Sequence, residues 1–573
     1  MMLLLFLWAL ATYGCFTYGF LFYKTTGLWR FREPAEPVQG SDFVLAGLCL
    51  LVAYVQIASL FFPANSNLTA VWLAGAVLIT FRYSDQVRTY GRQFFQKQRL
   101  VPVFGLLVLT VLLYSTLSPA NADSGLYHLP SIRWYERFRV VPGLGNLHGR
   151  LAFNSSFFVA SAAFGLTDLV GQTLFPLNGF VFLLVSWRLL NQAHSRGPYR
   201  WPAFAILLLI LYYLIRQVYS PTPDLWATLL PVAVFLIWLE IKPVFSFRLV
   251  LLVMLVSLSL TVKLATIPVA LSLVTVAWAV RRKLTAGQWG LLGSIGLCLV
   301  VPWLVRNVIL SGYLLYPYPA LDLFSFDWKI PADRVQFEKD FVAFWAKFRI
   351  HEAYYQPDLL NTPATEWIPR WLFHPEHYAL NKPIWALAVV SPVVAVSHFF
   401  SPRRKAAFRP LNLPYGVALA GFLFWFLSAP EFRFGYAFIW LTALLPWQPV
   451  VSGPVRGRMG NRVVNGLVTG ASLILIGYFG NRYLVGERFP VERYAVLPRP
   501  LTYTDKGTRQ AMFIERETRS GMLVLTPRAA PLEQSCFNEE MPCSPYYYPD
   551  LEMRGRTLAD GFRSSRQRAS RNL

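Results

Sequence analysis

The chain has 573 residues, of which 55% are hydrophobic and only 14% are charged, and its 45 Phe, 28 Tyr and 19 Trp require burial. Soluble proteins carry about 25% charged residues, so this composition excludes a multidomain soluble protein and a disordered chain, and it indicates a polytopic membrane protein. The formal net charge is +23. The basic residues lie in short clusters between apolar runs rather than in one stripe, which argues against a nucleic-acid partner and for the lipid bilayer.

The first apolar run covers residues 2–23. No positive residue precedes it and no small-residue cleavage site follows it, so we expect a membrane span rather than a cleaved signal. Lys24, Arg30 and Arg32 follow the run. Basic residues favour the cytoplasmic side, and this places the N-terminus outside the cytoplasm.

The hydropathy pattern predicts about fourteen transmembrane helices, since a span needs about 20 apolar residues and about 17 at the least. A further apolar piece, 153–166, is too short to span, and we expect an interfacial helix or a re-entrant segment. The predicted spans, some of them short, are 2–23, 43–62, 66–81, 100–118, 168–187, 201–215, 225–239, 247–262, 265–280, 288–305, 383–400, 412–428, 434–450 and 463–480.

The charges agree with fourteen alternating spans. Five alternate gaps, 82–99, 188–200, 281–287, 401–411 and 451–462, hold the basic clusters, which assigns them to the cytoplasm. Among the 30 acidic residues, only Glu33, Glu36, Asp42, Asp85 and Glu240 fall on that side. Acidic residues contribute little to topology, so their accumulation on the other side indicates that the working surface is extracytoplasmic.

Three parts follow from this topology: N-terminal transmembrane helices at 1–100, a transmembrane module at 101–480, and a small extracytoplasmic region at 481–573. The module contains two long outer segments, 119–167 and 306–382. The second has an amphipathic stretch whose aromatic residues share one helical face: Phe337, Phe341, Phe344, Trp345 and Phe348. The fold class expected is therefore an all-α polytopic integral membrane protein.

The cysteines fall into two groups. Cys15, Cys49 and Cys298 lie in apolar runs and are expected to be packing residues. Cys536 and Cys543 lie close together in the polar tail, and a local disulfide is the natural interpretation if the tail is outside the cytoplasm. No CxxC or Cys/His spacing typical of zinc occurs, and P-loop, GxSxG and HExxH motifs are also absent from the sequence.

The first outer loop carries the leading catalytic candidate, Asp123. A carboxylate at a membrane surface can accept a proton from an attacking hydroxyl. Asp123 can equally cap a helix that begins at Ser124, and the two roles are compatible. His128 lies five residues on; it is a candidate metal ligand or phosphate donor, or an ordinary hydrogen-bonded residue.

Further charges stand at outer span ends. A charge at membrane depth costs about 2.5–3.5 kcal/mol and is functional by default, although each one alone could snorkel to the interface. Lys263, Arg306 and Arg433 are cations suited to phosphate. Asp224 could supply a second carboxylate. The candidates assigned to substrate binding are thus His128, Asp224, Lys263, Arg306 and Arg433.

The pattern resembles the GT-C superfamily of polytopic membrane glycosyltransferases over about 101–480. The resemblance rests on Asp123 with Tyr127-His128, on Pro302-Trp303-x-x-Arg306-Asn307 followed by Gly312-Tyr313 and Tyr316-Pro317, and on Arg433-Phe434. Most of the chain also resembles a largely uncharacterised bacterial multi-pass membrane-protein family, including a tail with Cys536…Pro542-Cys543, Arg554-Gly555 and Gly561-Phe562. The first loop departs from many GT-C enzymes in one respect, because Asp123 has no acidic neighbour.

The GT-C resemblance implies a membrane glycosyltransferase in a bacterial inner membrane. The basic residues that flank the first and last predicted spans place both termini outside the cytoplasm. The resemblance also implies a polyprenyl-phosphate-linked sugar donor and a glycan, lipid or protein acceptor in cell-envelope glycan assembly. Lys263, Arg306 or Arg433 would stabilise the leaving phosphate, and Asp123 would take the acceptor proton. A divalent metal is a candidate cofactor, with Asp123 and Asp224 as candidate ligands.

Two alternatives stay open. A transporter or flippase of lipid-linked saccharides would share the basic lining but would show repeat symmetry and polar residues deep in mid-span. A glycan polymerase or ligase would use the same kind of site. Trp134, Tyr135 and Trp303 could pack on sugar faces, although an interfacial aromatic belt is the preferred interpretation.

Overall fold

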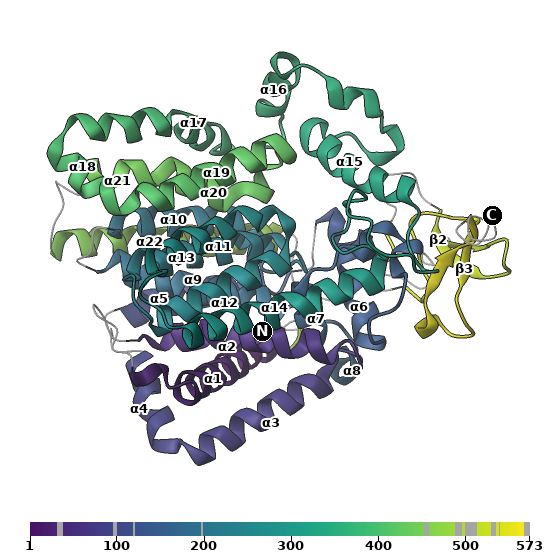
Figure 1. The fold of residues 1–573 in the computed structure, drawn as a ribbon, viewed down its shortest axis with the longest axis horizontal. Coiled ribbons are helices and arrows are strands. Elements are labelled where there is room, and N and C mark those ends of the chain that lie inside the picture. The colour runs from purple at the N-terminus through teal and green to yellow at the C-terminus, as the bar shows by residue number, and fades with distance from the viewer. Residues whose placement is uncertain are drawn as a thin grey trace.

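The computed structural model describes residues 1–30, 38–94, 100–117, 121–195, 199–451, 458–486, 495–498, 513–528, 535–537 and 539–566, and the described chain is mainly helical (Figure 1). Arg32, Glu33 and Glu36 lie outside this part, as do Lys97, Arg99, Arg196 and Arg456 of the basic gaps. The helices are α1 (Met2–Thr25), α2 (Gly40–Ala58), α3 (Ser66–Arg82), α4 (Ser84–Phe94), α5 (Val101–Tyr114), α6 (Leu129–Arg137), α7 (Ser156–Ala163), α8 (Thr167–Val170), α9 (Pro176–Ala193), α10 (Arg200–Leu214), α11 (Asp224–Glu240), α12 (Phe247–Val262), α13 (Ala270–Val280), α14 (Ala286–Ser311), α15 (Ala332–Phe348), α16 (Ala364–Leu372), α17 (Asn381–Ser397), α18 (Pro402–Phe408), α19 (Asn412–Ser428), α20 (Phe432–Leu444), α21 (Gln448–Val451) and α22 (Arg458–Phe479).

Each of the fourteen predicted apolar segments contains a helix. Among the described residues, seven helical stretches are long and apolar enough to cross a membrane: Met2–Thr25, Gly40–Ala58, Ala286–Ser311, Asn381–Phe400, Pro402–Ser428, Phe432–Val451 and Arg462–Gly486. Helices such as α5 and α13 are shorter, so length and composition alone do not count them as spans. The chain is accordingly a helical membrane protein.

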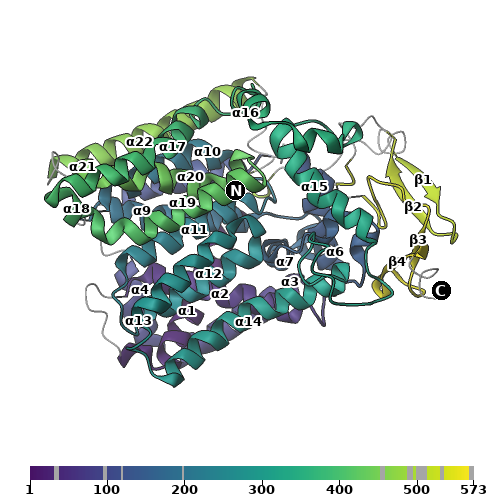
Figure 2. The ribbon, with the colours of Figure 1, turned by 45° about the horizontal axis from the view of Figure 1, so that its top comes forward.

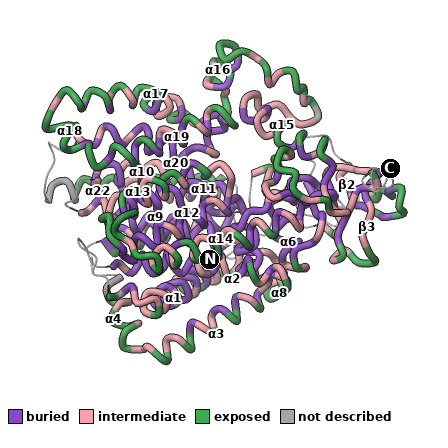
Figure 3. The backbone as a smooth tube through the Cα atoms, in the orientation of Figure 1, coloured by how far each residue is buried: buried purple, intermediate pink, exposed green. Residues whose placement is uncertain are grey.

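Apolar side chains cover the outside of the helical body. They include Phe81 on α3, which is 80% exposed, and Ile474 on α22, which is 73% exposed. Trp278 on α13 and Val393 on α17 are exposed in the same way. Figure 3 shows these peripheral helices largely exposed around a buried centre. An apolar exterior of this extent suits contact with lipid chains rather than water.

The centre of the body consists of α2, α9, α11 and α12, which are buried along most of their length. Glycines bring α1 against α2, since a Cβ on Gly47 would stand 1.8 Å from the carbonyl oxygen of Cys15. Small residues of this kind let helix backbones approach closely in membranes. Cys15 and Cys49 are buried here as expected, whereas Cys298 on α14 is exposed, so the expectation that it packs inside is wrong.

A group of buried ion pairs joins the central helices at one end. Arg188 on α9 contacts Asp42 on α2 and donates to Glu240 on α11 at 2.6 Å. Arg248 on α12 lies 3.5 Å from Glu240. Buried charges are stable only when they are paired. The predicted topology places all four residues on one side of the membrane, and their contacts show that they do lie together.

Two sequence boundaries need correction. The segment 153–166 contains α7, whose residues are all buried among protein side chains. An interfacial helix would expose one face, so that alternative does not describe α7. The predicted span 168–187 begins eight residues too early, because α9 begins at Pro176. The preceding stretch is α8 and a turn in which Gly171 has a φ of 74°.

The outer segments and the tail form a separate layer at one end of the helical body (Figure 2). The tail contains β1 (Phe513–Glu517) paired antiparallel with β2 (Leu523–Pro527), and β3 (Leu551–Met553) paired antiparallel with β4 (Phe562–Ser564). Phe513 is opposite Pro527, and Leu551 is opposite Ser564. The all-α expectation is therefore wrong for the tail, whose short strands gave no clear alternation in the sequence.

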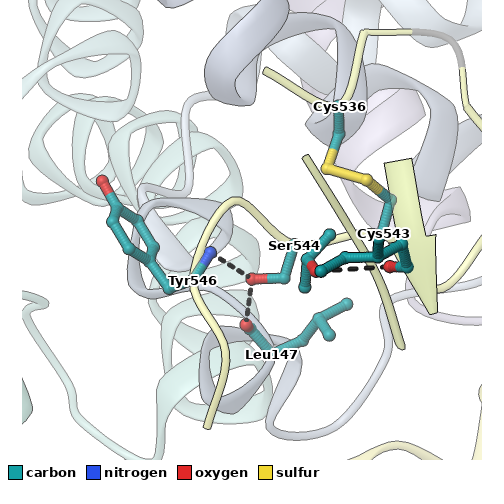
Figure 4. Close-up of a disulfide and its surroundings, with 7 residues drawn as sticks. Leu147, Cys536, Cys543, Ser544 and Tyr546 are labelled. Carbon is teal, nitrogen blue, oxygen red and sulfur yellow. Dashed lines mark hydrogen bonds between the residues drawn. A yellow bond between two sulfur atoms is a disulfide. The ribbon is translucent and has the colours of Figure 1, made fainter. Parts of the chain in front are cut away.

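The tail docks on the first outer loop. The amide of Phe562 donates to the carbonyl of Pro142 at 2.9 Å, and the amide of Phe537 donates to the carbonyl of Gly125 at 3.0 Å. The predicted disulfide between Cys536 and Cys543 is present. Close to it, Ser544 donates to the carbonyl of Leu147 at 2.9 Å (Figure 4).

Candidate functional site

Four charged side chains predicted from different span ends meet at the outer layer. Arg433, in the first turn of α20, donates to Asp123 at 2.7 Å, and its other terminal nitrogen lies 3.4 Å from Asp224 at the start of α11. Lys263, which follows α12, contacts the second oxygen of Asp224. We call Asp123, Asp224, Lys263 and Arg433 the charge cluster.

Asp123 does not act as the helix cap that the sequence allowed. Its side chain makes no capping hydrogen bond to the turn Ser124–His128. Instead, the side chain of Asn121 accepts a hydrogen bond from the amide of Asp123 at 3.0 Å. The carboxylate of Asp123 is consequently left to face Arg433, and 20% of it is exposed.

The loop before α11 holds Asp224 in place. Asn178 on α9 donates to the carbonyls of Ser220 and Thr222 at 2.6 and 3.1 Å. The hydroxyl of Ser220 lies 2.6 Å from the hydroxyl of Ser124, beside Asp123. Asp224 also stands at a helix N-terminus, where the helix dipole stabilises negative charge. These contacts fix the two carboxylates relative to one another.

Opposing charges set the ionisation of Asp123. Burial alone would raise the pKa of its carboxyl, but the positive charges of Arg433 and Arg150 lower it, and the net result is a pKa well below the usual range. Asp123 is therefore ionised at neutral pH. The cluster has two carboxylates and two cations, so its formal charges balance, and an incoming anion would compete with the carboxylates for Lys263 and Arg433.

Both cations keep some access to the surface. The side chain of Arg433 is 18% exposed and that of Lys263 is 24% exposed. Lys263 lies 3.7 Å above the ring of Phe434, and Arg433 lies 5.1 Å from the centre of the Trp345 ring. The aromatic face predicted on α15 thus reaches the cluster through Trp345.

His128 is buried beside the cluster. Its ring lies 4.4 Å from the ring of Tyr127 and 5.4 Å from that of Phe158. Burial lowers its pKa to about 4, so the ring is neutral. Its Nδ1 has no hydrogen-bond partner among the described residues. A neutral, unpartnered nitrogen next to Asp123 can accept a hydrogen bond from a ligand hydroxyl.

Arg306 lies apart from the charge cluster. It is fully buried on α14, where it donates to the side chain of Asn154 at 3.0 Å and contacts Ser59. The ring of Tyr135 lies 4.6 Å from its guanidinium. These contacts join α14 to the first outer loop and to the end of α2.

The three candidate sugar-stacking aromatics are also enclosed. Trp134 and Tyr135 are each 2% exposed and Trp303 is 7% exposed. The indole nitrogen of Trp303 donates to the carbonyl of Asn154 at 2.5 Å. These rings have no free face for a sugar or for a lipid interface, so both interpretations made from the sequence are wrong for them.

The donor set does not suit a divalent metal. In the part of the chain that the structure describes, no group of three or more His, Cys, Asp and Glu side chains could hold a metal ion. Asp123 and Asp224 are bound to Arg433 and Lys263, and a dication between them would face both positive charges. We derive no step through a metal.

Sequence reasoning missed a second polar network. Arg150 donates to Glu352 at 2.7 Å and lies 3.5 Å from Glu338 on α15. The hydroxyl of Tyr546 in the tail contacts the same Glu352. The available signals were the run Tyr546-Tyr547-Tyr548 in a polar tail and the acidic residues on α15. Neither shows from sequence alone that tail and loops meet.

A family model described as a domain of unknown function (DUF8201) matches residues 1–440. The chain belongs to this family. No curated protein and no solved structure gives a significant match. The DUF8201 match includes all four residues of the charge cluster and ends within α20. The tail that carries Tyr546 lies beyond the matched residues.

Proposed function

We propose that this protein is a glycosyltransferase of the GT-C type that moves a sugar from a polyprenyl-phosphate donor to an acceptor outside the cytoplasm. The observation that carries the proposal is the charge cluster. It sets a partly exposed, ionised carboxylate against two partly exposed cations at the outer ends of α11, α12 and α20. This is the combination that a phosphate-linked donor and a hydroxyl acceptor require.

The reaction would begin when the donor phosphate binds Lys263 and Arg433. Arg433 has a buried Nε without a hydrogen-bond partner among the described residues, which is free to donate to phosphate. The acceptor oxygen attacks the anomeric carbon and the polyprenyl phosphate leaves with the electrons of the broken bond. Asp123 takes the acceptor proton, with inversion at the anomeric carbon.

Donor binding would also activate the base. Arg433 holds the pKa of Asp123 low, and a carboxylate of low pKa accepts protons poorly. A phosphate that binds Arg433 neutralises part of this charge, so the pKa of Asp123 rises toward a useful value. The carboxylate would become an effective base only when the donor is present, which protects the site from unproductive proton transfer.

The membrane arrangement belongs to the proposal. Fourteen crossings place the charge cluster, the long outer segments and both termini on the extracytoplasmic side of a bacterial inner membrane. Contacts between loops support this arrangement, because the amide of Met2 donates to the carbonyl of Ala495 in the tail at 3.0 Å. The product would enter cell-envelope glycan assembly.

The test replaces Asp123 by Asn, which preserves size and removes the base. Asp358→Asn, at an exposed acidic residue of the second outer segment, is the matched control. In a strain lacking the protein, Asp123→Asn should lower glycosyl transfer about 10²–10⁴-fold at normal membrane abundance. Surface glycans give the readout. Wild-type glycans from this variant would contradict the assignment of Asp123, and accumulation of lipid-linked saccharide inside the cell would favour the transporter alternative.

A further inference from the structure

A cavity of about 670 Å³ lies in the outer layer, away from the charge cluster. Its walls come from three places: the first outer loop at Gly145 and Gly149, helix α15 with Glu338, and the tail with Tyr546 and Tyr547. A volume of this size is typical of small-molecule sites.

The tail wall of the cavity is held by several fixed contacts. Cys543 is bridged to Cys536, and Ser544 accepts a hydrogen bond from the amide of Tyr546 at 3.1 Å (Figure 4). The hydroxyl of Tyr547 donates to the carbonyl of Glu517 at 2.6 Å. The guanidinium of Arg334 lies 3.9 Å from the centre of the Tyr548 ring. The tyrosines therefore stand in defined positions.

The charges of the lining point to an uncharged ligand. Acidic and basic side chains are nearly balanced, and several are paired across the cavity. Arg334 on α15, for example, donates to Asp550 in the tail at 2.5 Å. Such a lining offers no surplus charge for a phosphate or another polyanion. Its tyrosine rings and many hydrogen-bonding groups match the apolar faces and hydroxyls of a sugar.

Two buried polar atoms at this cavity lack a hydrogen-bond partner among the described residues. They are Nη1 of Arg334 and Oε2 of Glu338, which is 3% exposed and whose ion-pair partner, Nε of Arg150, lies 3.5 Å away. A buried polar group without a partner costs about 1–3 kcal/mol unless a ligand or water satisfies it. Burial raises the pKa of Glu338 to about 7, so the carboxyl can donate as well as accept a hydrogen bond to a hydroxyl.

We propose that this cavity binds the acceptor as an uncharged, hydroxyl-rich saccharide. The acceptor role rests on the proposed glycosyl transfer, whereas saccharide binding itself does not. Arg150 connects the two sites, because it contacts Glu338 and Glu352 at the cavity and also lowers the pKa of Asp123. Gly149 leaves room for the Glu338 side chain, since a Cβ at position 149 would lie 2.5 Å from Oε1 of Glu338.

The experiment measures binding to the full chain in lipid nanodiscs. The probe is a fixed panel of neutral hexasaccharides built from glucose or N-acetylglucosamine, observed by saturation-transfer NMR. Tyr547→Ser removes a ring from the cavity, Tyr547→Phe retains it, and Tyr354→Ser removes an exposed ring elsewhere on the outer layer. Wild type, Tyr547→Phe and Tyr354→Ser should bind alike, and Tyr547→Ser about tenfold more weakly, as expected for the loss of about 1.4 kcal/mol.

The outcomes separate this inference from the proposed function. Asp123→Asn should lower transfer about 10²–10⁴-fold and still bind the panel. Saccharide binding without any transfer in the wild type would overturn the proposed function and support the cavity as a saccharide site. Absence of saturable binding to every panel member, or unchanged binding by Tyr547→Ser, would overturn the inference even if transfer is found.

Discussion

Arg433 donates a hydrogen bond to Asp123 over 2.7 Å and so joins two segments that lie 310 residues apart. The contact holds the first turn of α20 against the first outer loop. It also holds Asp123 ionised. The same bond therefore contributes to the fold of the outer layer and restrains the carboxylate that we propose as the base.

The two arginines predicted for phosphate, Arg433 and Arg306, should behave differently when replaced. Arg433→Gln removes a partly exposed cation from the charge cluster, and we expect about 10–100-fold weaker use of the donor. Arg306→Gln breaks the contacts with Asn154 and Ser59, and we expect lower thermal stability and membrane abundance. Donor titrations of the purified variants, together with their melting curves, measure both effects.

A clear result would contradict that division of roles. If Arg306→Gln is normally abundant and selectively impaired in donor use, then Arg306 belongs to the phosphate site and the charge cluster is incomplete. If Arg433→Gln has unaltered donor kinetics, phosphate binds elsewhere.

Stability should depend on pH through Glu338. Burial raises its pKa from the usual 4.5 to about 7, so the folded chain binds this proton more tightly than the unfolded chain. The bound proton contributes up to about 3 kcal/mol to the free energy of unfolding. This contribution is complete below about pH 4.5 and is lost as the pH rises to about 7. Glu338→Gln stays neutral and should become more stable than wild type above pH 7. Thermal unfolding in detergent at pH 5 and pH 8 tests this, and parallel profiles for the two proteins would refute it.

Tail docking should depend on Gly143. Its φ is 63°, and a Cβ there would lie 2.1 Å from the carbonyl oxygen of Phe562 and 2.7 Å from Trp328. Gly143→Ala should therefore separate the tail from the first outer loop, which limited proteolysis detects as faster cleavage. Gly171→Ala is the matched control, since Gly171 has a φ of 74° but open space around it. Equal cleavage rates for the two variants would show that backbone strain, and not the close approach, matters.

The predicted topology has its own test. A reporter that is active only after export should be active when fused after Leu573, because Arg456, Arg458 and Arg462 precede the predicted span 463–480 and favour the cytoplasm. The same reporter inserted between Arg404 and Lys405 should be inactive. Activity in the second position, or its absence in the first, would overturn the arrangement of fourteen spans.

The sequence located the helices better than it located the contacts among them. Long apolar runs predicted the apolar helices of the body but not the short polar helices α4 and α18. The start of α9 was missed because apolar residues continue through the turn before Pro176. Charge at span ends assigned residues to one side of the membrane, and Asp123, Asp224, Lys263 and Arg433 do meet there. Charge at a span end does not indicate where around the helix bundle a residue lies, which is why Arg306 was grouped with the charge cluster. The cavity at Tyr546 depends on contacts between distant segments, which periodicity does not encode.

The order of the sequence has a consequence for biosynthesis. All four residues of the charge cluster precede the tail, whereas one wall of the cavity, including Arg516, Tyr546 and Arg566, comes from residues made last. Domains generally fold from the N-terminus during synthesis. A nascent chain that has inserted α1 to α20 thus holds its proposed donor site but no closed acceptor cavity, and transfer on the outer surface would have to wait until the tail has been translated, exported and oxidised.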